Sequence, residues 1–216
     1  MRIACLALLM TLLPLAGCES TYYSAMEKVG IHKRDIFVDR IEDVKEAQIE
    51  GQEQFKSALE QFQKTVNFDG GHLQQAYEEL NAEYEASEDA ANTIHERIDA
   101  VESVAEALFD EWESELSQYT SSKLRQQSQT QLNDTRKRYK ALLATMKTAE
   151  KSLTPVLNTL RDNTLYLKHN LNAQAIASLK NESNTIKTDV NRLIADMNKA
   201  IAASDRFIAD FKKNQP

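Results

Sequence analysis

The chain has 216 residues, five glycines, three prolines and two cysteines, and its 33 acidic and 26 basic residues give a net charge of −7. This acidic balance argues against nucleic acid as a partner, because affinity for nucleic acid depends on cations that neutralise phosphates. The scarcity of glycine and proline favours long helices.

The N-terminus predicts an export signal that ends in a lipidation site. Arg2 precedes an apolar stretch at 3–13, which is shorter than the about 20 residues that a membrane-spanning helix needs. The motif Leu15-Ala16-Gly17-Cys18 then resembles the lipobox of bacterial lipoprotein precursors at each position. The resemblance implies cleavage after residue 17 and acylation of Cys18 with long chains such as palmitate. Because Glu19 follows the cysteine, it also implies an outer-membrane location facing the periplasm.

The other cysteine, Cys5, is removed with the signal peptide. Cys5 lies within 1–17, so the mature chain has no free thiol once Cys18 is acylated. A disulfide, a cysteine-bound metal and a thiol nucleophile are therefore not expected. The predicted organisation is a signal peptide at 1–17, a membrane-proximal segment at 18–34 and a helical bundle domain at 35–216.

The membrane-proximal segment combines aromatic and basic residues. In one interpretation Tyr22 and Tyr23 rest in the lipid interface while Lys33 and Arg34 face the headgroups. In the other, this stretch is the frayed first turn of the first helix. The sequence leaves both interpretations open.

Apolar residues recur in alternating steps of four and three along the rest of the chain. The clearest series runs from Leu73 through Ile98 to Tyr119, and it predicts a helix with a sustained heptad pattern. Short connections between such segments imply antiparallel neighbours. The expected fold is therefore all-α, an elongated antiparallel four-helix bundle or coiled coil. The predicted helices cover about 35–66, 72–119, 122–169 and 173–213.

Charge is divided unequally between the second and third predicted helices. Segment 72–119 has 14 acidic residues and Arg97 as its one basic residue, whereas segment 120–169 has ten basic and three acidic residues. The favoured interpretation is that the two helices pair with complementary flanks.

A simple hairpin geometry specifies that pairing. If residues equidistant from the turn at 120–122 meet, Ile98 faces Leu142, and the acidic flank lies near the basic residues of segment 136–140. The acidic flank is Glu96, Asp99 and Glu102. The alternative is a basic face left free for an anionic partner, which would consist of Lys123, Arg125, Arg136, Lys137, Arg138 and Lys140.

No motif of an active site is present. The four histidines are scattered, and none belongs to a known metal-binding or catalytic spacing. Glu115 and Asn163 lie on core lines, but a di-metal site needs further inward carboxylates and histidines at the same depth. No catalytic residue, metal or cofactor is expected, and the chain is predicted not to be an enzyme.

Several segments resemble an uncharacterised bacterial family, domain of unknown function 2959. The resemblance is carried by residues 22–35, 38–42, 54–62 and 166–179 and extends over essentially the whole mature chain. It implies the helical architecture and no known catalytic residue.

These features predict a lipoprotein anchored in the cell envelope through Cys18. The expected function is that of a non-enzymatic structural, scaffold or adaptor protein whose long helical faces bind another envelope protein, and the pattern is also compatible with a homo-oligomer. The alternative is a membrane-binding or membrane-remodelling module that lays the basic face of its third helix on anionic lipid. The net negative charge argues against this alternative.

Overall fold

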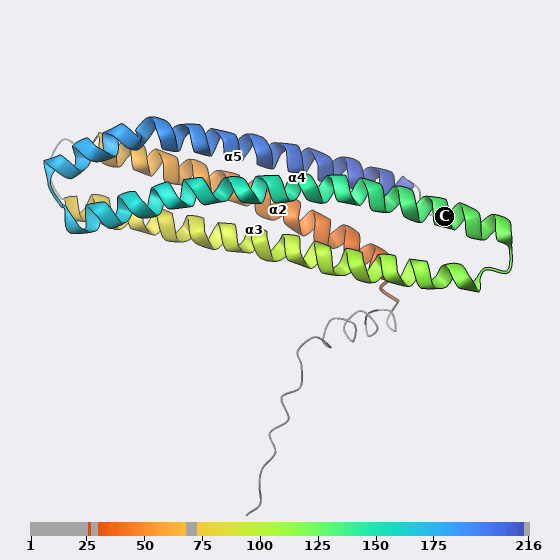
Figure 1. Cartoon of the computed structure of the whole chain (residues 1–216). Coiled ribbons are helices and arrows are strands. Elements are labelled where there is room, and N and C mark those ends of the chain that lie inside the picture. Colours follow the sequence, from red (N-terminus) through yellow and green to blue (C-terminus); the bar gives the residue numbers. More distant parts are fainter. Residues whose placement is uncertain (1–25, 27–29, 68–72, 214–216) are drawn as a thin grey trace, which may run out of the picture.

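The computed structural model describes residue 26, residues 30–67 and residues 73–213, and Figure 1 shows their arrangement. Within this part of the chain 94% of the residues are helical and no strand occurs. A short 3₁₀ helix, η2 (Leu116–Gln118), follows the second of four long helices. The long helices are α2 (Lys33–Val66), α3 (Leu73–Glu115), α4 (Ser122–His169) and α5 (Ala173–Lys213).

The four helices form a closed antiparallel bundle within one chain. α2 and α4 each pack against both α3 and α5, so every helix has two neighbours. Consecutive helices run in opposite directions along a common axis (Figure 1). The predicted all-α bundle is thus confirmed. With 48 residues, α4 alone gives the rod a length of about 70 Å.

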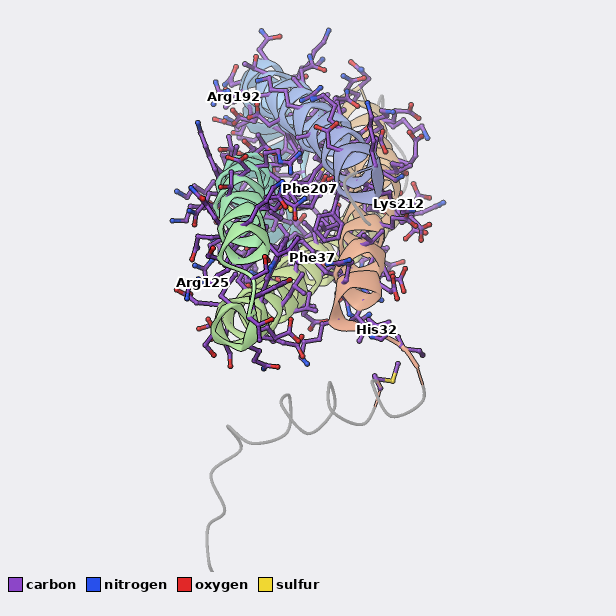
Figure 2. The ribbon with its side chains drawn as sticks, turned by 90° about the vertical axis from the view of Figure 1, so that its right-hand side faces the viewer. His32, Phe37, Arg125, Arg192, Phe207 and Lys212 are labelled. Carbon is purple, nitrogen blue, oxygen red and sulfur yellow. The ribbon has the colours of Figure 1, made fainter. Side chains whose placement is uncertain are left out.

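A cluster of aromatic rings joins all four helices near one end of the bundle. Phe37 of α2 is fully buried at its centre and meets Phe109 of α3 and Tyr139 of α4 at ring centroid distances of 6.2 and 5.6 Å. Phe207 and Phe211 of α5 lie 5.6 and 5.5 Å from the same ring. All four contacts are edge-to-face, which aromatic quadrupoles favour. Figure 2 shows Phe37 and Phe207 inside the bundle, while Arg125 and Arg192 project outward.

A polar layer interrupts the core on α2. Gln48 is fully buried, and neither atom of its amide has a hydrogen-bond partner among the described residues. One turn further, a Cβ added to Gly51 would lie only 2.9 Å from Cδ1 of Ile94. The glycine therefore allows α2 and α3 to approach closely at this level.

The connection between α3 and α4 differs from the simple turn that the sequence suggested. α3 ends at Glu115, and after η2 the backbone of Tyr119 is extended. The side chain of Ser121 then caps α4 by accepting a hydrogen bond from the amide of Leu124 at 3.3 Å. Tyr119 was predicted to be a core position, but it is exposed because the helix has already ended.

This connection changes the register of the helix pair. α3 and α4 do pack antiparallel, but Nζ of Lys147 lies 3.2 Å from Asp99 and 2.8 Å from Glu102. The predicted contact of these carboxylates with residues 136–140 is therefore wrong. The 3₁₀ and extended residues advance farther per residue than the 1.5 Å of an α-helix, which shifts α3 along α4.

Lys147 is the centre of the acidic and basic contact between α3 and α4. It also lies 3.4 Å from Glu150, and its side chain is 31% exposed. Partial burial alone would lower the pKa of Lys147, but the hydrogen bonds to Glu102 and Asp99 outweigh it and raise the pKa. The lysine thus stays charged and screens three carboxylates from one another.

We expect Lys147→Gln to lower the free energy of unfolding by about 1 kcal/mol at low ionic strength, because it leaves the three carboxylates to repel one another. The loss should shrink in about 1 M salt, which screens exposed charges. Urea unfolding at both salt concentrations measures it. Lys151→Gln is the matched control, because Lys151 is exposed on the same helix and forms no ion pair within the described residues. An equal loss in both variants would contradict the role of Lys147.

His95 adds a pH dependence to the same cluster. Its Nδ1 bonds to Glu150 and its Nε2 lies 3.3 Å from Asp99. The bond to Glu150, followed by the charge of Asp99, raises the pKa of His95 above 6.5. Protonated His95 therefore stabilises the fold below pH 6.5, and this contribution is lost as the pH rises through the raised pKa.

We expect His95→Gln to lower the melting temperature at about pH 5.5 and to leave it unchanged at about pH 9. A difference that persists at the higher pH would contradict this origin.

Candidate functional site

The two ends of the bundle are built differently. At the end where α2 begins and α5 finishes, called here the proximal end, the connection between α3 and α4 extends beyond the other two helices (Figure 1). At the opposite, distal end, α5 follows α4 after a short corner at 170–172. The sequence predicted the helices but not this difference between the ends.

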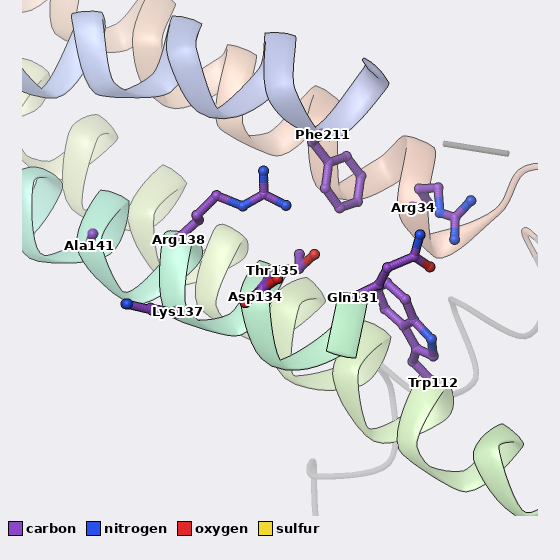
Figure 3. A pocket seen from close by; sticks show the side chains of 9 residues that line it. All are labelled: Arg34, Trp112, Gln131, Asp134, Thr135, Lys137, Arg138, Ala141 and Phe211. Atoms are coloured by element: carbon purple, nitrogen blue, oxygen red, sulfur yellow. The ribbon is translucent and has the colours of Figure 1, made fainter. Parts of the chain in front are cut away.

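A cavity of about 500 Å³ opens at the proximal end. All four helices contribute to it: Arg34 from α2, Trp112 from α3, a row of residues from α4, and Phe211 from α5 (Figure 3). Its volume is within the range of about 300–1,000 Å³ that small-molecule sites occupy. The residues from α4 are Gln131, Asp134, Thr135, Lys137, Arg138 and Ala141.

The cavity lining has an excess of positive charge. Three cationic side chains, Arg34, Lys137 and Arg138, face one carboxylate, Asp134. Nη1 of Arg138 is 4.0 Å from Asp210 of α5, a distance too long for a good hydrogen bond. Nε of Arg138 is buried and has no hydrogen-bond partner among the described residues. A buried donor of this kind normally has a partner, so its isolation here is unusual.

Aromatic rings form the apolar part of the lining. The guanidinium of Arg34 lies 5.9 Å from the centroid of the Trp112 ring, within the range of a cation–π contact. Nε1 of Trp112 donates to Oγ of Ser128 at 2.8 Å, which fixes the orientation of the indole. Phe211 is buried and continues into the ring cluster around Phe37. The cavity thus combines cations with rigid apolar surface.

The six residues of the predicted basic face do not share one surface. Arg136 points toward α3, where it pairs with Glu113 at 2.7 Å and lies 5.5 Å from the Phe109 ring. Arg138 points toward α5, on the other side of α4. The remaining four are exposed and have no ion pair within the described residues: Lys123, Arg125, Lys137 and Lys140.

The structure describes only some of the predicted membrane-proximal residues. Cys18, Tyr22 and Tyr23 lie outside the described residues. Lys33 and Arg34 form the first turn of α2, and Nζ of Lys33 lies 3.1 Å from Glu111 of α3. In the structure these two cations are therefore bound to the end of the bundle.

Large apolar side chains are exposed mainly at the two ends. Ile31, Tyr119 and Leu124 are exposed at the proximal end. Leu165, Tyr166 and Leu171, called here the distal patch, are 50, 41 and 39% exposed around the corner between α4 and α5. Along the sides of the rod, Ile49 is the single such residue within the described part of the chain. The heptad pattern did not reveal either end: it placed Tyr119 in the core, and it gave no signal for the distal patch.

No metal site was predicted, and the described residues contain no group of three or more histidine, cysteine or acidic side chains arranged to hold a metal ion. Glu115 is exposed at the end of α3, and Asn163 donates to the carbonyl of Thr159 in its own helix. Among the described helices, none has the length and apolar character that crossing a bilayer requires.

Comparison with known protein families gives a match. The family described as a protein of unknown function (DUF2959) matches residues 22–211, which include all four helices except the last two residues of α5. No curated protein and no solved structure matches the chain. The match covers most of the sequence, and the chain therefore belongs to the DUF2959 family.

Proposed function

We propose that this protein is a lipoprotein of the cell envelope that acts as a non-enzymatic scaffold or adaptor, anchored at one end and bound to a partner protein at the other. The observation that carries the proposal is the placement of exposed apolar side chains at the two ends of a closed rod. A closed bundle with a polar surface along its sides is suited to hold its ends apart.

The proximal end is the anchored end in this proposal. The lipobox motif places the acylated residue at Cys18, fifteen positions before the first residue of α2. Two or three acyl chains at Cys18 would hold the protein firmly, since each buried CH₂ contributes about 0.8 kcal/mol. A bundle about 70 Å long would then carry its distal end well away from the leaflet.

The distal patch is the proposed contact for the partner. Leu165, Tyr166 and Leu171 expose apolar surface next to the charged Lys168 and the polar His169. Apolar and aromatic groups with a polar rim are typical of the centre of a protein interface. The partner is expected to be another envelope protein with a complementary apolar surface.

In-cell crosslinking tests the scaffold function. A photoreactive amino acid at Tyr166 or Leu171 should form an adduct with the same protein in both cases. The control position is Asn191, which is exposed along the side of α5 and should form little adduct. Equal adducts at all three positions, or none from the distal patch, would contradict the proposal.

The anchor has its own test. We expect Cys18→Ser to abolish incorporation of a labelled fatty acid, because the thiol is the acylated atom. The outcome is measured by metabolic labelling and gel fluorography of the full chain. A Cys18→Ser chain that still incorporates the label would show that acylation, if present, occurs elsewhere.

We prefer the scaffold to a module that lays a basic face of α4 on anionic lipid. Arg136 and Arg138, which would belong to that face, are directed toward acidic residues of two different neighbouring helices. The net charge of −7 also disfavours attraction of the whole chain to anionic lipid.

A further inference from the structure

We propose that the cavity at the proximal end binds an amphipathic anion, a small molecule or lipid with a phosphate or carboxylate group attached to an apolar chain. The acidic group would bind the guanidinium of Arg138, with Arg34 and Lys137 adding positive charge, and the apolar chain would lie against Trp112 and Phe211. The inference goes beyond the scaffold function, and it concerns the cavity alone.

The first argument is the unused donor of Arg138. Its Nε is buried without a partner among the described residues, and Asp210 is 4.0 Å from a different nitrogen of the same group. A planar guanidinium binds phosphate and carboxylate through two parallel hydrogen bonds, for which Nε is one of the usual donors. An anion bound by the Arg138 guanidinium would supply the partner that Nε lacks among the described residues.

The second argument is the charge around the cavity. Arg34 and Lys137 line it together with Arg138, and Asp134 is the one acidic residue among the nine that line it. Figure 3 shows Arg138 and Arg34 on opposite sides of the Phe211 ring. This excess of cations within a chain of negative net charge marks the cavity as a local site for an anion.

The third argument is the apolar surface beside the cations. The hydrogen bond from Trp112 to Ser128 holds the indole in place, and Phe211 packs on Phe37 behind the cavity. Rigid rings of this kind bind an apolar chain without losing much conformational freedom. Inorganic phosphate would use the cations but not the rings, so the site fits an amphiphile better than a free ion.

The chain supplies its own reporter for a binding experiment. Trp112 is the sole tryptophan of the sequence, so intrinsic fluorescence reports on the cavity directly. A chain that starts at Glu19 retains every described residue, and with them the whole bundle. It lacks Cys18, so the result does not depend on the proposed anchor.

Octyl phosphate, kept below its micelle concentration, is the probe. We expect a saturable change in Trp112 fluorescence, and at least about tenfold weaker binding for both octanol and inorganic phosphate. Octanol tests whether binding needs the charged group, and inorganic phosphate tests whether it needs the octyl chain. If inorganic phosphate binds as tightly as octyl phosphate, the ligand is not an amphiphile and the cavity is a simple anion site. If octyl phosphate gives no saturable change in fluorescence, the proposal is overturned altogether.

Two variants test the location of the site. Arg138→Gln should weaken octyl phosphate binding at least about tenfold. Ala141→Phe should also weaken binding, because Ala141 is exposed at the cavity and a ring there would occupy part of its space while α4 keeps its buried face. Lys140→Gln is the control, since Lys140 is exposed nearby and does not line the cavity. Circular dichroism confirms that each variant is folded, and unchanged binding by folded Ala141→Phe would overturn the proposal even if Arg138→Gln does not fold.

Vesicles identify the source of the anion. If phosphatidylglycerol vesicles produce the same fluorescence change, and Arg138→Gln abolishes it, the ligand is a lipid of the leaflet. If the vesicles produce no change while octyl phosphate binds, the ligand is a free amphiphile. Both outcomes support the cavity as the site and differ in what fills it.

Discussion

Phe37→Ala should lower the free energy of unfolding by about 3–5 kcal/mol, the cost typical of removing a buried phenylalanine. Phe37 is fully buried, and its ring touches four other rings contributed by the other three helices. Removing it would leave a void at the point where all four helices meet, and the rings around it could close that void only by moving their helices. Urea unfolding followed by circular dichroism measures the loss.

The matched control is Tyr166→Ala. Tyr166 is an aromatic residue of similar size on α4, but it is 41% exposed at the distal end. Its removal should change the free energy of unfolding by less than about 0.5 kcal/mol, as is usual for surface substitutions. Similar losses in both variants would mean that the ring cluster does not hold the bundle together.

Gln48→Met should raise the free energy of unfolding by about 1–3 kcal/mol, the usual cost of a buried polar group without a partner. Both amide atoms of Gln48 lack a hydrogen bond among the described residues, and the side chain is fully buried. Methionine has nearly the same length and flexibility, so it can fill the same space without the cost of burying the amide. Thermal and urea unfolding measure the gain.

A neighbour one turn away provides the control. Gln52 of the same helix is 8% exposed, and its amide donates to Oδ1 of Asn198 at 3.1 Å. Gln52→Met removes this hydrogen bond and should therefore give no gain in stability. If Gln48→Met is destabilising, the amide of Gln48 has a partner in solution, and the polar layer has a role in aligning the helices.

The sequence was sufficient to predict the fold because one physical pattern determines it. The alternation of three and four along α3 places Leu80, Ile94 and Ile98 on a single face, and all three are fully buried. The pattern describes each helix separately, however, and says little about how far one helix is shifted along the next. The contact of Asp99 with Lys147 was missed for that reason.

The candidate site depends on the same missing information. Arg34, Lys137 and Arg138 were recognised as cations that could meet an anion or a membrane. Nothing in the local pattern brought these residues together with Trp112, because the cavity exists only at the level where the ends of α2 and α5 meet the flanks of α3 and α4. A site formed by the register of four helices cannot be recognised one helix at a time.

The order of the helices around the bundle affects how the chain acquires its structure. Three of the four contacts between neighbouring helices join consecutive segments, which can pair as soon as a short connection allows. The fourth, between α2 and α5, joins the beginning of the domain to its end, as in the pairs Lys45 with Asp205 and Gln52 with Asn198. The contact between α2 and α5 closes the longest loop of the four, and it is therefore expected to form most slowly. Because the chain is synthesised from its N-terminus, α2 must wait with one face uncovered until the last helix has been made.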